Sequence, residues 1–169
     1  MHRWFPFLLV ACRSNDPPPV PDAALDAGVS ATCTGACAVT ALSAAFQTTH
    51  VLDEAVFGFT TSDSTLHVEA YRGGAGGCPS DTSPTPDYTL VLGKVAMPTG
   101  TAGTSSPGNV LDFVGDLLGG SLGAQATMVS IFAVAAGTDF VALDIALEFT
   151  DGMVTGHLYA THCDSLDSP

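Results

Sequence analysis

The C-terminal part of the chain alternates between apolar and polar residues, and this alternation limits what the chain can fold into. Residues 140–149 read FVALDIALEF and residues 153–162 read MVTGHLYATH, with Asp151-Gly152 between them. Alternation places successive side chains on opposite faces of a strand, and Asp-Gly between two such runs favours a type I′ turn. The pattern therefore predicts an antiparallel hairpin with one buried and one hydrated face.

A hairpin with Asp151 and Gly152 as its turn also has a defined register. The expected pairs are Thr150 with Met153, Glu148 with Thr155, Ala146 with His157, and Asp144 with Tyr159. The face expected to be buried carries Val141, Leu143, Ile145, Leu147, Phe149, Val154, Leu158 and Ala160. The hydrated face carries Asp144, Glu148, Thr155, His157 and Tyr159.

Earlier segments repeat the strand pattern. Residues 64–72 alternate with Leu66, Val68 and Ala70 facing inward and His67, Glu69 and Tyr71 facing outward, and we expect residues 55–61 to pair with them. Further strands are expected at residues 39–48, 88–95 and 128–134. Seven or eight short strands in all predict an all-β fold, an antiparallel β-sandwich.

Three other segments interrupt this pattern. Residues 73–87 and 97–109 are rich in Gly, Pro, Ser and Thr and are expected to be loops. Residues 110–118 have apolar residues at helical spacing, but the surrounding β pattern favours a strand bent at Gly115.

The five cysteines form two sets, one residue in the N-terminal segment and four in the rest of the chain. Cys12 ends a short apolar run, whereas Cys33, Cys37, Cys78 and Cys163 form an even set that suits an oxidising compartment. Four cysteines allow three pairings, and we favour two disulfides that staple the domain at residues 33–169. Cys78–Cys163 would tie the Gly/Pro-rich loop to the last strand, and Cys33–Cys37 would close a small turn. A four-cysteine zinc site is disfavoured because paired Cys-x-x-Cys ligands are absent from the sequence.

The N-terminus has the features of an export signal. Met1-His2-Arg3 is positively charged, residues 4–10 are apolar, and Leu9-Val10-Ala11-Cys12 resembles the lipobox of bacterial lipoproteins. The resemblance implies a signal peptide at residues 1–11, cleavage before Cys12 and a diacylglycerol on its sulfur. It further implies an exported protein anchored by lipid in the cell envelope, in the outer membrane, with secretion as the alternative.

The domain itself shows a second resemblance. The run from Cys78 to Leu90 and the closing run from Phe149 to Cys163 are similar to uncharacterised lipoproteins of high-GC Gram-negative bacteria. This resemblance implies no activity.

Residues 12–32 join the expected anchor to the domain. They contain Pro17, Pro18, Pro19 and Pro21 with interspersed aspartates and few large apolar groups, so we expect a disordered tether. At about 3.1 Å per residue, such a stretch reaches roughly 60 Å. This length suits a spacer that holds a domain away from a membrane.

The net charge of the chain limits the classes of partner that it can bind. Acidic residues outnumber Lys and Arg by 17 to 4, giving a net charge of −13. A surface this negative repels phosphate backbones and anionic lipid head groups, so we expect no nucleic-acid binding and no basic membrane-binding patch. The membrane contact is expected through the lipid on Cys12, and an unidentified protein or glycan is the expected partner.

One group of side chains offers metal chemistry. His67 and Glu69 share an outward strand face, as do Glu148 and His157, and the four would suit a divalent metal if their strands were neighbours. A hydrated face with ordinary cross-strand pairs explains the same residues. We therefore assign no metal ligand and no cofactor.

Other polar groups give little support for catalysis. Ser121 lacks the G-x-S-x-G turn of hydrolases, Asp112 and Asp116 lack a cleft for glycoside hydrolysis, and His50 is expected in a loop. The sequence thus favours a non-catalytic surface module with a structural, adhesive or partner-binding role. The alternatives are a divalent-metal or small-ligand binder and, less favoured, a secreted hydrolase.

Overall fold

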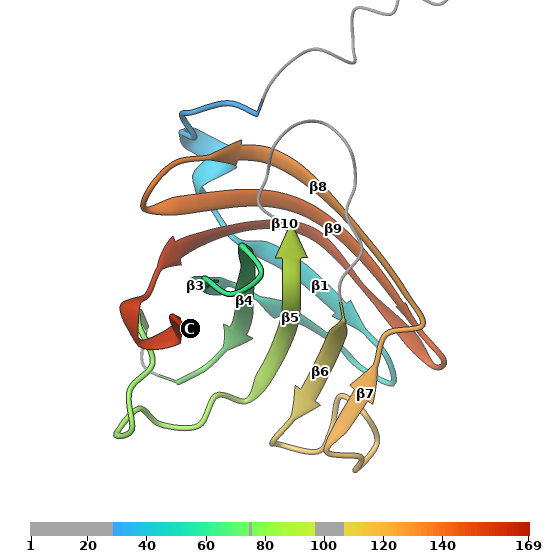
Figure 1. Ribbon diagram of the computed structural model, residues 1–169. Helices are drawn as coiled ribbons and strands as arrows, with labels where there is room; N and C mark the ends of the chain where they lie inside the picture. The colour runs from blue at the N-terminus through green and yellow to red at the C-terminus, as the bar shows by residue number, and fades with distance from the viewer. Residues whose placement is uncertain (1–28, 75, 97–106) are drawn as a thin grey trace, which may run out of the picture.

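Strands dominate the computed structural model, which describes residues 29–74, 76–96 and 107–169. Within these residues ten strands form one continuous curled sheet (Figure 1). They are β1 (Ala41–Ala45), β2 (Thr49–Leu52), β3 (Glu54–Thr60), β4 (Thr65–Arg72), β5 (Tyr88–Ala96), β6 (Gly108–Asp112), β7 (Gly123–Gln125), β8 (Met128–Ala136), β9 (Phe140–Phe149) and β10 (Gly152–His162). Two short 3₁₀ helices, η2 (Gly35–Ala38) and η3 (Asp164–Leu166), complete the described structure. The expected signal peptide, the lipobox with Cys12 and most of the tether lie outside the described residues.

The strand β10 organises the sheet because it changes partner along one edge. Its other edge pairs with β9 throughout, from Gly152 to Thr161. On the changing edge, β1 pairs antiparallel with residues 153–157, and β3 then pairs parallel with Thr161 and His162. The sheet therefore folds over at β10, because strands that move from one layer to the next form the corners of such packings.

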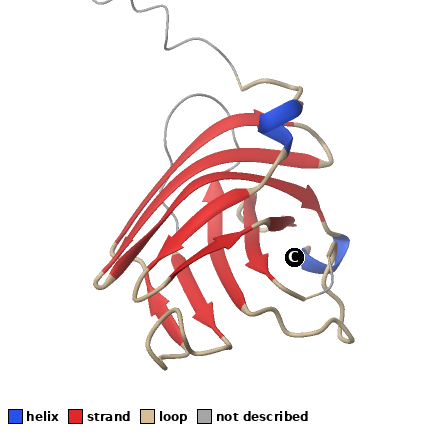
Figure 2. Ribbon diagram, turned by 180° about the vertical axis from the view of Figure 1, so that it is seen from behind, coloured by secondary structure: helices blue, strands red, loops and turns tan. Residues whose placement is uncertain are grey.

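Two layers result from this fold-over. One layer contains β8, β9, β10, β1 and β2, and its long strands lie side by side in Figure 2. The other runs in the order β3, β4, β5, β6 and β7 from the end of β10. The all-β prediction is confirmed, with two differences: the layers are halves of one sheet, and the β3–β10 pair makes that sheet mixed.

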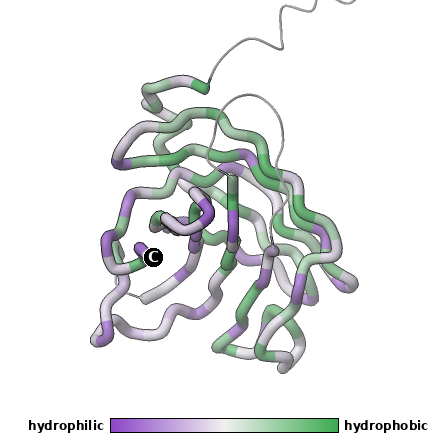
Figure 3. The backbone as a smooth tube through the Cα atoms, in the orientation of Figure 1, coloured by the Kyte–Doolittle hydropathy of each residue, from purple (hydrophilic) through white to green (hydrophobic). Residues whose placement is uncertain are grey.

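The core lies between the two layers. Figure 3 shows the hydrophobic and hydrophilic residues alternating along the strands that enclose it. Its fully buried members come from both layers: Leu42, Leu52, Phe57, Leu66, Val68, Leu90, Leu92, Val110, Leu143, Leu147, Val154 and Leu158. The inward face predicted for the C-terminal hairpin and for residues 64–72 is confirmed, because every one of those side chains is buried.

The register predicted for the hairpin is wrong by two residues. The structure pairs Phe149 with Gly152 and Asp144 with His157, so Thr150 and Asp151 form the turn. Neither Thr150 nor Asp151 has a positive φ, and neither has Gly152, so the turn is not type I′. Glycine is needed at position 152 for another reason: a Cβ there would collide with the ring of Phe46 and the backbone carbonyl of Ala45.

Residues 110–118 are strand at first and turn afterwards. β6 ends at Asp112, and the chain then turns through Gly115 at φ +91° instead of continuing as a bent strand. The buried Asp112 carboxylate accepts hydrogen bonds from the backbone N–H of Gly115 (2.6 Å) and of Leu118 (2.7 Å). Burial acts to raise the pKa of Asp112, but the backbone donors outweigh it and leave the pKa below its ordinary value.

Both disulfides favoured from the sequence are present. Cys33 is joined to Cys37, which lies in η2, and Cys78 is joined to Cys163 across 85 positions of sequence. Cys163 is completely buried and packs with Val56 and Tyr71, so the second disulfide fastens the loop of residues 73–87 to the end of β10. Disulfides persist in oxidising compartments, and this indicates an extracytoplasmic protein.

A buried threonine closes the gap where β10 changes partner. The last residue of β10 paired with β1 is His157 and the first paired with β3 is Thr161, so Tyr159 has no strand partner on that edge among the described residues. The Thr40 hydroxyl donates to the Tyr159 carbonyl and accepts from the Tyr159 N–H, both at 2.9 Å. Thr40 is only 7% exposed, so water does not reach these groups easily. Its two hydrogen bonds therefore take the place of those that a neighbouring strand would make.

We expect Thr40→Val to destabilise the domain. The substitution keeps the shape but leaves two backbone groups of Tyr159 without partners, a loss of about 1–3 kcal/mol in the free energy of unfolding. Urea unfolding measures it, with Thr155→Val on the outer face of β10 as the matched control. Equal effects of the two substitutions would contradict the role given to Thr40.

Candidate functional site

The four residues considered as metal ligands lie on two opposite faces of the molecule. His67 and Glu69 are on the outer face of β4, which pairs with β3 and β5. Glu148 and His157 are on the outer face of the β9–β10 hairpin in the other layer. The condition for a shared metal, neighbouring strands, is therefore not met.

Each histidine of that set has a local partner instead. His67 Nε2 lies 2.9 Å from Glu69 Oε1 on the same strand. His157 Nδ1 lies 2.7 Å from Asp144 Oδ1, and its Nε2 lies 2.8 Å from the carbonyl oxygen of Cys37. The register predicted from the sequence missed Asp144 because it placed Ala146 opposite His157.

The carboxylates considered for hydrolysis have structural partners. Asp112 caps the turn after β6, and Asp116 Oδ1 accepts a hydrogen bond of 2.6 Å from the Tyr88 hydroxyl. His50 is on β2 and not in a loop, and its Nε2 lies 3.3 Å from the same hydroxyl. Burial, together with the bond to Asp116, raises the pKa of Tyr88 to about 12, so the phenol stays protonated.

Ser121 also lacks the surroundings of a nucleophile. It lines an open hollow of about 270 Å³, together with Asp151, Phe46 and Phe149. No histidine is among the described residues that line this hollow, so the histidine base of a Ser-His pair is not placed next to Ser121.

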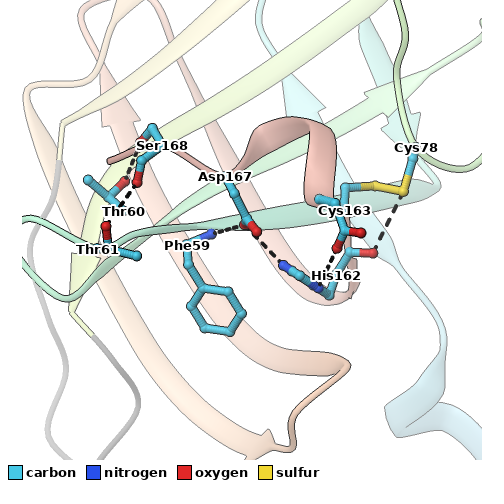
Figure 4. A network of polar contacts seen from close by, with 9 residues as sticks. Phe59, Thr60, Thr61, Cys78, His162, Cys163, Asp167 and Ser168 are labelled. Carbon is cyan, nitrogen blue, oxygen red and sulfur yellow. Dashed lines mark hydrogen bonds and ion pairs between the residues drawn. A yellow bond between two sulfur atoms is a disulfide. The ribbon is translucent and has the colours of Figure 1, made fainter.

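A polar network fastens the C-terminus to β3 (Figure 4). The Asp167 carboxylate accepts from the Phe59 N–H at 2.7 Å, and His162 Nε2 lies 3.0 Å from the same oxygen. The backbone of Ser168 continues the contact, donating to Phe59 and accepting from Thr61. This network, which we call the C-terminal clasp, explains Gly58, because a Cβ there would collide with the backbone of Leu166.

The clasp includes a cluster with metal-ligating chemistry, His162 with Asp164 and Asp167. The imidazole presents a different nitrogen to each acid: Nδ1 is 3.4 Å from Asp164 and Nε2 is 3.0 Å from Asp167. The ring therefore lies between the two carboxylates. Its two nitrogens face different acids, so no single nitrogen points to a position that both carboxylates could also reach as ligands. The arrangement is that of a structural clasp.

A second set of polar groups surrounds Tyr71, at the end of β4. On one side the loop of residues 73–87 covers a cavity of about 70 Å³ lined by Glu69, Tyr71, Gly77 and Thr89, with three proline rings. On the other side lies a more open cleft of about 330 Å³ lined by Asp53, Glu54, Tyr71 and Tyr159. We call the two hollows together the Tyr71 site.

Negative charge gathers around the Tyr71 hydroxyl. The hydroxyl donates to the Gly77 carbonyl at 2.7 Å, which fixes the ring between the two hollows. Burial raises the pKa of Tyr71, and the carboxylates of Glu54 and Glu69 raise it further. Two acidic side chains from neighbouring strands thus act on one buried phenol.

Sequence reasoning missed the Tyr71 site for a physical reason. Alternation correctly places Tyr71 on the outer face of its strand, but the side chain is only 6% exposed. The cover is the loop of residues 73–87, which Cys78–Cys163, together with the Ser165 hydroxyl bonded to the Pro79 carbonyl, holds against this face. Cys78 was the signal in the sequence that this loop is crosslinked to another part of the domain.

No family model, curated protein or solved structure matches the chain. Among the described residues, no helix is long and apolar enough to span a bilayer. The fold and the crosslinks define the class: an extracytoplasmic, disulfide-stapled all-β domain.

The clasp makes one carboxylate a source of acid sensitivity. Hydrogen bonds from the Phe59 N–H and from His162 hold the pKa of Asp167 below its ordinary value of 3.8. A lowered folded-state pKa stabilises the fold above the ordinary value, and the stabilisation is lost as the pH falls through the lower one. We expect Asp167→Asn to flatten the acid side of the stability profile, measured by urea unfolding below about pH 4.

The matched control for this experiment is Asp151→Asn, which removes the same charge from an exposed side chain in the β9–β10 turn, outside the clasp. It should leave the acid slope as in the unsubstituted protein. An acid slope unchanged by Asp167→Asn would show that the clasp does not couple to protonation.

Proposed function

We propose that the chain is a lipid-anchored protein of the bacterial cell envelope whose domain is a non-catalytic partner-binding module. The observation that carries the proposal is the division of the cysteines. Four of them are consumed by the two disulfides of the domain, which leaves Cys12 outside the crosslinked set. That residue ends the segment that resembles a lipobox.

The composition of residues 12–32 supports a tethered arrangement, because this stretch is rich in Pro and Asp and poor in large apolar groups. The domain receives the chain at the edge of β8, where the backbone of Ser30 bridges Ala135. Two or three acyl chains on Cys12 anchor a protein stably, whereas a single chain gives marginal binding.

The surroundings of the polar side chains support a non-catalytic role. Asp112 caps a turn, Asp116 and His50 contact a protonated phenol, and His157 bridges Asp144 and a backbone carbonyl. In each case a group that is chemically able to activate a nucleophile or a water holds the structure together instead. A module that binds a partner through its surface does not need any of these groups to be free for catalysis.

We expect Cys12→Ser to release the protein from the membrane fraction, because the serine hydroxyl cannot carry the thioether-linked lipid. Fractionation of the producing bacterium, followed by immunoblotting, measures the release. Mass spectrometry of the mature chain reports the acyl groups and the new N-terminus in the same sample.

The control is the double substitution Cys33→Ser with Cys37→Ser, which removes two sulfurs but leaves Cys12. This variant should remain in the membrane fraction. A Cys12→Ser protein that still sediments with membranes, and is not released from them by high salt, would contradict the anchor. If the Cys12→Ser protein and the unsubstituted protein are both found in the culture medium, the result would favour secretion.

A further inference from the structure

The cavity under the loop of residues 73–87 has a buried hydroxyl that no hydrogen bond among the described residues uses. Thr89 is 6% exposed and is among the groups that line the cavity. None of the side-chain hydrogen bonds formed by the described residues involves its hydroxyl. A buried polar group without a partner is costly, so its presence next to an accessible cavity points to a partner that enters from outside.

The other polar atoms that line this cavity are mostly acceptors. Glu69 Oε1 is occupied by His67, but Oε2 has no partner among the described residues. The Gly77 carbonyl accepts one bond from the Tyr71 hydroxyl and retains a second lone pair. The cavity therefore suits a ligand that supplies several donors.

No permanent cation of the described chain neutralises these acceptors. The two described Lys and Arg side chains are Arg72 and Lys94, and neither lines the cavity or the neighbouring cleft. Lys94 lies 4.0 Å from Asp63 instead. Glu54 and Asp53 line the cleft on the far side of the Tyr71 ring and add to the negative field.

We propose that the Tyr71 site binds a primary alkylammonium group, with the ammonium between Glu69, Thr89 and Gly77. An ammonium has three donors and no acceptor, which matches these three acceptor groups. The Tyr71 ring provides an aromatic wall for the cation. The inference rests on the proposed binding role of the domain and is independent of the lipid anchor.

The size and apolar walls of the cavity fit a short alkyl stem. A volume of 70 Å³ holds about five groups the size of a water molecule, which is an ammonium with three or four methylenes. Pro79, Pro84 and Pro86 line the cavity and offer apolar surface to the stem. Two sources carry this chemistry: the lysine side chain of a protein, and a free aliphatic diamine.

The test is a titration of the full chain carrying Cys12→Ser, in which binding is monitored through the amide chemical shifts. The two probes are Nα-acetyl-lysine N-methylamide and 1,4-diaminobutane, and the neutral control is the first probe acetylated on its ε-nitrogen. We expect saturable shifts at Gly73, Gly77 and Thr89 with at least one amine and none with the neutral control. Saturation by the lysine derivative alone identifies a protein side chain as the source, and saturation by the diamine alone identifies a free diamine.

Two substitutions test the contacts directly. Thr89→Val and Glu69→Gln should each raise the dissociation constant about tenfold, the usual effect of losing one hydrogen bond to a charged group. Thr89→Val should leave the melting temperature unchanged or higher, because the hydroxyl has no hydrogen-bond partner in the described part of the chain. Glu148→Gln on the opposite face is the matched control for Glu69→Gln and should leave binding unchanged.

Three results would overturn the proposal: no saturable shift with either amine, equal binding of the neutral control, or an equal loss from Glu148→Gln and Glu69→Gln. The last would mean that the acidic surface attracts amines without a site. None of these results affects the membrane fractionation of Cys12→Ser, so failure of the ligand inference and failure of the anchor are distinguishable.

Discussion

The structure depends on one strand, β10, that belongs to two layers at once. Its edge pairs first with β1 and then with β3, and the Thr40 hydroxyl fills the gap between these partners. Because the backbone groups of a buried strand must all be paired, any loosening of β10 exposes polar groups of both layers. The curl of the sheet, the enclosed core and the parallel β3–β10 pair all follow from this change of partner.

The end of β10 is also where the features of functional interest meet. Cys163 directly follows the strand and holds the loop of residues 73–87 over Tyr71 through its bond to Cys78. The clasp that fastens the C-terminus to β3 begins one residue earlier, at His162. A crosslink of this span stabilises a fold by about 4–5 kcal/mol in the chain-entropy model. Here it also holds the loop that covers the Tyr71 site, so the site as well as the stability of the fold depends on an oxidising compartment.

Features set by local chemistry could be predicted from the sequence. Alternation identified the buried face of the C-terminal hairpin, and cysteine parity led to the two disulfides that the structure contains. Features set by distant contacts could not. Asp151-Gly152 indicated a type I′ turn, but the glycine is there because Phe46 approaches it, and the register moved by two residues. Tyr71 is buried by a loop whose position no strand pattern encodes, so the candidate site was missed although Glu69, Tyr71 and Thr89 lie in correctly predicted strands.

Hydrogen exchange of the native protein tests most directly whether β10 unites the two layers. The account predicts that the amides of β10, β9 and β3 share the slowest exchange and open with one free energy, that of global unfolding. It further predicts that reduction of Cys78–Cys163 lowers this free energy for both layers together. Exchange of β3, β4 and β5 through a separate and less costly opening, with β9 and β10 still protected, would show that the layers are independent units and would contradict the account.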